Sequence, residues 1–222
     1  MTFISRIFSR SNWFWIVLCV LLLYVIPPFL APIFMHLGWG SPGKAIYLLY
    51  SFLCHQLPER SFFLFGPHLT YPLAQIQQVA GLKNTGDLFA LRQFIGNSQI
   101  GWKVAWSDRM VSMFTSIPLF ALTWYPLRRH LPRIPWWGFL LLILPMLVDG
   151  GTHFISDLQG IGAGFRDTNT WLVTLTQQAY PPTFYAGDAW GSFNSIMRLG
   201  TGLLFGLGFV WFGFPYLEET IA

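Results

Sequence analysis

Three ionisable side chains lie inside or at the ends of apolar segments of this sequence, where charge is costly. Asp149 and His153 close one apolar segment, and Arg198 opens another. A carboxylate, an imidazole and a guanidinium at membrane depth cost free energy unless they pair or face a polar cavity. Asp149 and His153 are four residues apart, which places them on one face of a helix. These residues predict either a functional pocket or a buried structural ion-pair network.

Two histidines and a carboxylate could perform acid–base chemistry at such a site. An imidazole titrates near neutral pH, so His55 or His153 could act as a general acid or base, with Asp149 as a further candidate catalytic group. A histidine beside Gln and Pro at a helix end more often only caps backbone carbonyls. The sequence carries no familiar phosphatase, protease or transporter motif. The catalytic residues stay unassigned, and enzymatic activity stays uncertain.

The candidate ligand-binding residues are three arginines and one aspartate: Arg60, Arg109, Arg198 and Asp108. A planar guanidinium fork is well suited to the oxygens of a lipid phosphate. Each arginine could equally close a salt bridge to a carboxylate and stabilise the fold, and for Arg166 a pair with Asp167 is the favoured interpretation. If carboxylates satisfy all the arginines, a structural network suffices. An arginine pair that faces an open pocket instead predicts an anionic ligand.

Metal chemistry is only weakly indicated. Cys54, His55 and His153 offer sulfur and imidazole ligands that suit zinc or copper. However, adjacent Cys54 and His55 lack the usual Cys-x-x-Cys spacing, so we predict no metal site and leave the cofactor unknown. Cys19 and Cys54 are expected to lie too far apart for a disulfide.

The elements that must position these residues are membrane helices. Hydrophobic residues make up 54% of the chain and charged residues only 10%, well outside the averages for soluble domains. Four apolar segments approach the ~20 residues that cross a bilayer. They are residues 13–34, 110–127, 135–154 and 197–216. The predicted fold class is therefore an all-α membrane protein with four transmembrane helices, and residues 1–222 form a single integral membrane domain.

Basic residues in short loops predict the orientation. Arg6 and Arg10 precede the first segment, and Arg128, Arg129 and Arg133 connect the second to the third. Because positive loops face the cytoplasm, both termini are expected there, in a prokaryotic cytoplasmic (inner) membrane. The net charge of +4 then reflects topology, and no nucleic acid partner is expected.

The two longer connections are expected to fold as a cap on the outer face, rich in glycine, proline and aromatic residues. Within them, short interfacial or re-entrant helices are predicted at residues 45–53, 85–95 and 166–178. Asp149 and Arg198 reach a similar depth beneath this cap. We therefore expect Asp149→Asn and Arg198→Ala to be strongly coupled in their effects on stability.

Four sequence blocks carry a resemblance to a known family. They are Cys-His-Gln at 54–56 with Arg-Ser-Phe-Phe at 60–63, residues 101–109, Asp-Gly at 149–150, and Met-Arg-Leu-Gly-Thr-Gly at 197–202. Together they resemble a prokaryotic family of polytopic membrane proteins known as domain of unknown function 2085. The resemblance covers about residues 54–208 and implies a membrane fold without a mechanism.

The chain departs from that family's pattern at three positions. The resemblance implies cysteine in place of Ser107, an acidic residue or second cysteine in place of Met110, and glutamine in place of His153. If the pattern includes a thiolate metal site or a redox pair with Cys54, this chain lacks half of it.

The sequence thus predicts an integral membrane protein of unassigned activity with a polar site near the outer membrane interface. Its partners are the lipid bilayer and either a lipid-like or anionic ligand or other membrane subunits. One alternative is a non-catalytic accessory subunit of a larger membrane complex. A second alternative is a membrane-embedded acid–base or metal-assisted hydrolase.

Overall fold

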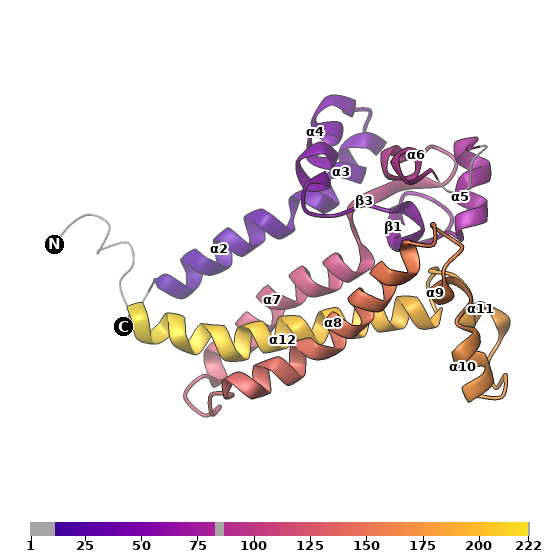
Figure 1. The fold of residues 1–222 in the computed structure, drawn as a ribbon. Coiled ribbons are helices and arrows are strands. Elements are labelled where there is room, and N and C mark those ends of the chain that lie inside the picture. The colour runs from indigo at the N-terminus through magenta and orange to yellow at the C-terminus, as the bar shows by residue number, and fades with distance from the viewer. Residues whose placement is uncertain (1–11, 83–86, 222) are drawn as a thin grey trace.

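Four long apolar helical segments dominate the computed structural model, which describes residues 12–82 and 87–221 (Figure 1). They are Trp13–His36 (24 residues), Asp108–Leu127 (20), Trp136–Asp157 (22) and Phe193–Ile221 (29). Each can cross a hydrocarbon core of ~30 Å. The predicted class of helical membrane protein with four spans is confirmed. The last span extends several residues beyond its predicted limits at both ends.

The first span consists of two helices, α2 (Trp13–Val25) and α3 (Pro27–His36). Pro27 and Pro28 lack backbone N–H groups, so they begin a helix readily but cannot continue the hydrogen-bond ladder of α2. The chain changes direction at this break (Figure 1). As a result α3 packs against α4 (Gly40–Ser51) and strand β3 rather than along the other spans.

The centre of the bundle is the contact between α7 (Asp108–Leu127) and α12 (Phe193–Ile221), with α8 (Trp136–Asp157) on α12. Gly202 and Gly206 of α12 face Ser112 and Ser116 of α7. A Cβ atom at position 202 would lie 2.8 Å from Ser112 Oγ, which is too close. The small residues therefore permit close approach of two helices of the same chain.

A small antiparallel sheet lies at one end of the bundle, and the sequence analysis did not predict it. It has the order β1-β3-β2, with β1 (Ser61–Leu64), β2 (Gly96–Asn97) and β3 (Gly101–Ser107). Four consecutive residues of β3 are buried, from Lys103 to Trp106. Because β3 ends where α7 begins, the sheet fixes the position of the first turn of a membrane span.

Short helices surround this sheet, and we call this end of the molecule the cap. They are η1 (Pro58–Arg60), α5 (Leu73–Ala80), α6 (Leu88–Gln93), α9 (Phe165–Thr168), α10 (Thr170–Leu175) and α11 (Pro182–Tyr185). Helix α4 overlaps the predicted segment 45–53. Helix α6 lies within 85–95, whose first two residues fall outside the described part. The segment 166–178 forms two short helices instead of one.

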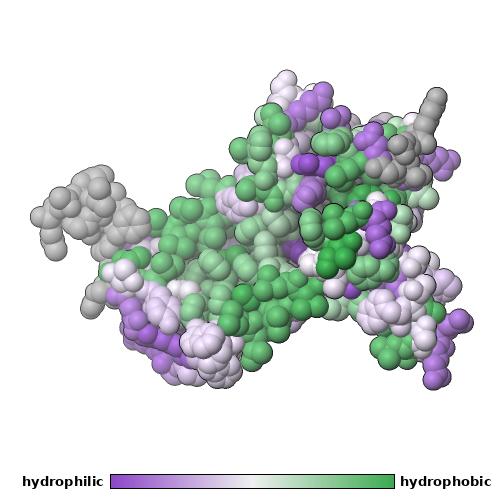
Figure 2. Space-filling model, viewed as in Figure 1, coloured by the Kyte–Doolittle hydropathy of each residue, from purple (hydrophilic) through white to green (hydrophobic). Residues whose placement is uncertain are grey.

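Apolar surface covers the spans and continues onto the cap (Figure 2). On α4 and just after it, Leu48, Leu49 and Phe52 are exposed by 65%, 64% and 83%. Exposed apolar side chains on the spans imply contact with the lipid bilayer. The exposed face of α4 has the same character, as expected of an interfacial helix.

Candidate functional site

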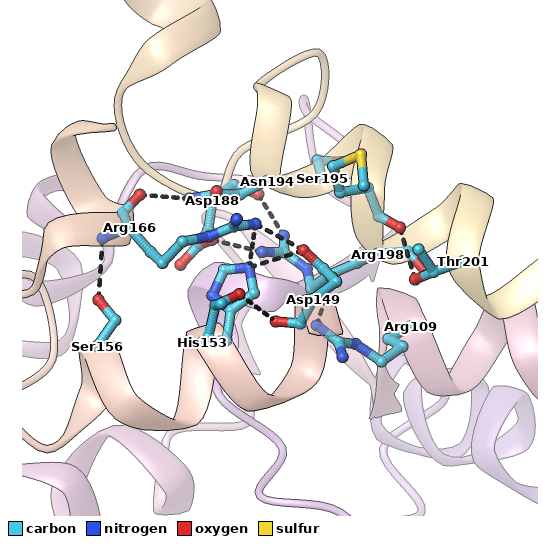
Figure 3. A network of polar contacts seen from close by, with 12 residues as sticks. Arg109, Asp149, His153, Ser156, Arg166, Asp188, Asn194, Ser195, Arg198 and Thr201 are labelled. Carbon is cyan, nitrogen blue, oxygen red and sulfur yellow. Dashed lines mark hydrogen bonds and ion pairs between the residues drawn. The ribbon is translucent and has the colours of Figure 1, made fainter. Parts of the chain in front are cut away.

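Asp149 is the centre of one group of charges at the cap end of α8 (Figure 3). Its carboxylate accepts hydrogen bonds from Arg109 Nη2 at 2.8 Å and from Arg166 Nη2 at 2.6 Å. Arg166 Nη2 also lies 3.2 Å from His153 Nε2. These four residues, which we call the Asp149 group, come from α7, α8 and α9. Here two guanidinium groups share one carboxylate.

A second group of charges surrounds Arg198 of α12. Arg198 binds both oxygens of Asp108 at 2.7 and 2.8 Å, and it also pairs with Asp188. Arg60 binds both oxygens of Asp157 at 2.7 Å and bonds to Asp188 at 2.9 Å. We call these five residues the Asp188 group. Here two guanidinium groups share three carboxylates.

The two groups together are neutral, but each is unbalanced. With its histidine neutral, the Asp149 group has a formal charge of +1, because it has two arginines and one aspartate. The Asp188 group has −1, from two arginines and three aspartates. Burial opposes ionisation of Asp188, but Arg60 and Arg198 hold the pKa of Asp188 well below its ordinary value. That carboxylate is therefore ionised at neutral pH.

Two pairings differ from the sequence interpretation. Arg166 pairs with Asp149, whereas Asp167 accepts a hydrogen bond from the backbone N–H of Gly164 at 2.8 Å. The expected Arg166–Asp167 pair is therefore wrong, because the carboxylate of Asp167 caps the start of its own short helix. Arg198 also binds Asp108 and Asp188 instead of Asp149.

The sequence analysis did not identify two members of the Asp188 group, Asp157 and Asp188. Asp157 follows Asp149 and His153 at the same spacing of four residues, so helical periodicity could have found it. Asp188 lies in an irregular segment between α11 and α12, where no periodicity indicates where a side chain points.

A cavity of about 440 Å³ lies beside both charge groups, between the segment after α4, the start of α7 and one face of α8. Its polar lining residues are Cys54, His55, Gln56, Arg60, Ser107, Arg109, His153, Asp157 and Arg198. Its apolar lining residues are Leu53, Leu57, Leu88, Met110, Phe154, Leu158 and Ile161. The cavity thus brings together most of the residues that the sequence marked as candidates. Asp108 and Asp149 stand behind its wall, bound to the arginines that line it.

The rim and the floor of this cavity differ in polarity. Leu53, Phe154 and Leu158 are exposed by 54%, 65% and 71%, and they lie beside membrane spans. Arg198 and His153 are exposed by only 2% and 4%. The cavity therefore passes from an apolar, lipid-accessible edge to a charged interior.

Arg109 is the least satisfied arginine that lines the cavity. Its side-chain hydrogen bond runs from Nη2 to Asp149, and in the described part of the chain Nε and Nη1 have no hydrogen-bond partner. Gly150 makes room for it, since a Cβ there would lie 2.5 Å from Arg109 Nη1. Arg166 Nε and His153 Nδ1 are buried and likewise have no partner among the described residues. The Asp149 group therefore has unused hydrogen-bonding capacity.

Cys54 and the three positions of departure from the family pattern line this same cavity. Cys54 Sγ accepts the backbone N–H groups of Gln56 and Ser107, both at 3.4 Å. Met110 and His153 lie on the same cavity wall. Residues 12–82 and 87–221 contain no group of three potential ligands close enough to hold a metal ion. Cys54, His55 and His153 thus line one cavity without forming such a group.

Two further buried ionisable groups lie in the cap. Burial raises the pKa of Glu59 from 4.5 to about 7, and neither carboxylate oxygen has a partner within the described ranges. Burial lowers the pKa of Lys103 from 10.5 to about 7. Lys103 Nζ donates to the carbonyl oxygens of Gln56 at 2.6 Å and Arg92 at 2.9 Å. This lysine of β3 therefore links the sheet to Gln56, in the segment after α4 that lines the cavity, and to the end of α6.

Four apolar helices around a buried charge network define a polytopic integral membrane protein. The comparisons with known proteins agree with this class. A family model described as "Predicted membrane protein (DUF2085)" matches residues 98–212, and the chain belongs to that family. The matched range includes Arg109, Asp149 and Arg198 but not the Cys-His-Gln block, for which the resemblance stays a prediction.

An uncharacterised protein of Methanocaldococcus jannaschii is 28% identical to this chain over 154 residues. The match covers 66% of this chain and 76% of that protein. No solved structure matches the chain.

Proposed function

We propose that this protein binds an amphipathic, lipid-like ligand with an anionic headgroup in the cavity beside the Asp149 group. The observation that carries the proposal is Arg109, which lines the cavity with two nitrogen positions unbonded in the described structure while sharing its one carboxylate with Arg166. An anionic group at this place would receive charge-assisted hydrogen bonds and offset the local charge of +1.

The shape of the cavity supports an amphipathic ligand. A volume of about 440 Å³ lies within the range of small-molecule sites and can hold a headgroup. The exposed rim residues Leu53, Phe154 and Leu158 would contact acyl chains that remain in the bilayer. With the cap on the outer face, as the loop charges predict, the ligand would enter sideways from the outer leaflet.

The alternative of a purely structural network receives partial support from the same contacts. Every arginine of the two groups has a carboxylate, so the fold does not require a ligand for charge balance. However, a structural role alone gives no reason for an open cavity against the group with surplus positive charge. We therefore favour ligand binding over the role of an accessory subunit.

Native mass spectrometry of the protein, purified from its own membranes in mild detergent, tests the proposal. The wild type should retain an adduct with the mass of an anionic lipid or similar amphiphile. Arg109→Gln should lose it, since glutamine has no charge, and Arg109→Lys should retain part of it, since lysine lacks the planar fork.

Arg129→Gln, which replaces an exposed arginine at the opposite end of the bundle, is the matched control and should retain the adduct. An adduct that survives Arg109→Gln unchanged would place the ligand elsewhere. A wild type without any adduct, together with stoichiometric partner subunits, would favour the accessory-subunit alternative.

A further inference from the structure

Two neighbouring hollows lie at the end of the bundle opposite the cap. One has a volume of about 230 Å³ and is lined by charged residues of the α7–α8 loop and the last turns of α12. The other, of about 150 Å³, lies between α7 and α12. Trp124 and Leu131 line both hollows, so the two hollows are neighbours, and we refer to them together as the groove.

The inner part of this groove is apolar. Phe120, Leu207 and Val210 line it, and its two polar side chains are occupied. Thr123 Oγ1 donates to the carbonyl of Leu119 at 3.0 Å, and Trp211 Nε1 donates to that of Pro132 at 2.8 Å. An acyl chain could lie here without leaving a polar group unpaired.

The outer part of the groove contains charges of both signs. Arg128 Nε pairs with Glu218 at 2.9 Å, and Arg133 pairs with Glu219. The side chains of the second pair are 52% and 51% exposed, so they can exchange partners at little cost. Hydrophilic side chains gather at this end beside the apolar surface of the spans (Figure 2).

We propose that this groove binds one phospholipid whose zwitterionic headgroup carries a primary ammonium. Part of one of its acyl chains would fill the apolar part between α7 and α12. Its phosphate would contact Arg128 and Arg133, and its ammonium would donate hydrogen bonds to Glu218 and Glu219. This site is independent of the cavity at the cap.

The pairing of charges selects this headgroup over others. A purely anionic headgroup would gain the arginines but would face two carboxylates of like charge. A quaternary ammonium has no N–H group, so it cannot donate a hydrogen bond to Glu218 or Glu219. A primary ammonium is positively charged and has three N–H donors, so it can both offset the carboxylates of Glu218 and Glu219 and donate hydrogen bonds to them.

Exposed apolar residues beside the groove also favour a lipid as its occupant. Leu131, which lines both hollows, is 36% exposed, and Leu127 at the end of α7 is 44% exposed, so exposed apolar surface extends from the span to the groove. A lipid therefore reaches the apolar part directly from the bilayer. A water-soluble molecule with the same headgroup would have no acyl chain to fill the apolar part of the groove.

The test uses the full chain in nanodiscs of phosphatidylethanolamine, phosphatidylcholine and phosphatidylglycerol in equal amounts and with identical acyl chains. Native mass spectrometry measures which lipids stay bound when the disc is removed. Phosphatidylethanolamine should be enriched over phosphatidylcholine by about two- to fivefold, the factor that exposed ion pairs supply. The double variant Glu218→Gln/Glu219→Gln should lose this preference, whereas Asp87→Asn on the cap should keep it.

Equal retention of the two zwitterionic lipids, or enrichment of phosphatidylglycerol at this groove, would overturn the proposal. A fluorescence measurement keeps the test valid if the double variant is unstable. Brominated chains on phosphatidylethanolamine should quench wild-type tryptophan emission more than the same chains on phosphatidylcholine. The double variant Trp124→Phe/Trp211→Phe, which removes both tryptophans of the groove, should remove the difference. An unchanged difference in Trp124→Phe/Trp211→Phe would exclude the groove as its source.

Discussion

The Asp149 and Asp188 groups use the same residue types at the same end of the bundle, yet they differ in how completely they are satisfied. In the Asp188 group three carboxylates surround two arginines, and none of its polar side-chain atoms within the described residues is buried without a partner. In the Asp149 group one carboxylate serves two arginines, and buried nitrogens of Arg166 and His153 have no partner among the same residues. The ratio of carboxylates to arginines thus separates a structural network from a potential binding site.

Arg198 and Arg109 also differ in burial. The side chains of Arg198, Asp108 and Asp188 are exposed by 2%, 3% and 4%, and they join α7, α12 and the segment before α12. Arg109 is exposed by 17% and faces the cavity. The first arrangement stabilises the attachment of cap to bundle, and the second can rearrange around a ligand.

The largest effect is expected for Arg198→Ala. It leaves Asp108 without its bidentate partner and Asp188 with Arg60 alone, both buried, so the free energy of unfolding should fall by about 3–5 kcal/mol. Thermal and denaturant unfolding in detergent measure this loss. Arg128→Ala, which breaks a partly exposed pair, should cost under about 1 kcal/mol. Equal costs for the two variants would refute the structural role of the Asp188 group.

The next effect concerns Glu59, which lies next to Arg60 and feels the negative charge of Asp188. Burial raises the pKa of Glu59 from 4.5 to about 7, so the folded state binds its proton more tightly than the unfolded state does. The stability that the neutral form contributes is complete below pH ~4.5 and is lost as the pH rises to about 7. Glu59→Gln should therefore become more stable relative to wild type across this range, by up to about 3 kcal/mol.

Unfolding curves of both proteins at several pH values between 4 and 7 measure this change. Lys103, whose pKa burial lowers to about 7, acts in the opposite direction, since its folded state gains stability between pH 7 and 10.5. Measurements below pH 7 therefore isolate Glu59. Parallel pH profiles for wild type and Glu59→Gln would show instead that folding does not shift the pKa of Glu59.

The sequence predicted the membrane layer well because hydropathy over about 20 residues is a strong signal. It also placed Asp149 and Arg198 near one level, since helical rise converts residue number into depth. It could not assign partners, because the position of Asp188 depends on an irregular segment. The sheet escaped notice for a similar reason: β1 and β2 have only four and two residues, too few to show an alternating pattern.

Double-mutant cycles measure how strongly residues within one charge group, and residues of different groups, depend on each other for stability. The sequence analysis expected strong coupling between Asp149→Asn and Arg198→Ala, but the structure places these residues in separate groups. We now expect that pair to couple less strongly than Asp149 and Arg166, because Asp149 and Arg198 share no direct hydrogen bond. Asp149→Asn and Arg166→Ala, which remove the two ends of one ion pair, should instead couple by about 1–3 kcal/mol. Unfolding in detergent measures both cycles, and the reverse order of the two coupling energies would show that the groups act as one network.

The smallest effect on stability is expected for Arg109→Gln. Its size distinguishes a ligand-binding role of Arg109 from a structural role. Asp149 keeps its hydrogen bond to Arg166, and the removed guanidinium faces a cavity that water can enter, so no buried charge is left unpaired. The loss should be about 1 kcal/mol or less, well below that of Arg198→Ala. Unfolding of protein stripped of lipid and of protein with added anionic lipid distinguishes the two roles. If Arg109 belongs to a binding site, the lipid should stabilise the wild type by mass action and leave Arg109→Gln unchanged. A large loss of stability without lipid, together with equal stabilisation of both proteins by lipid, would instead make Arg109 part of the scaffold.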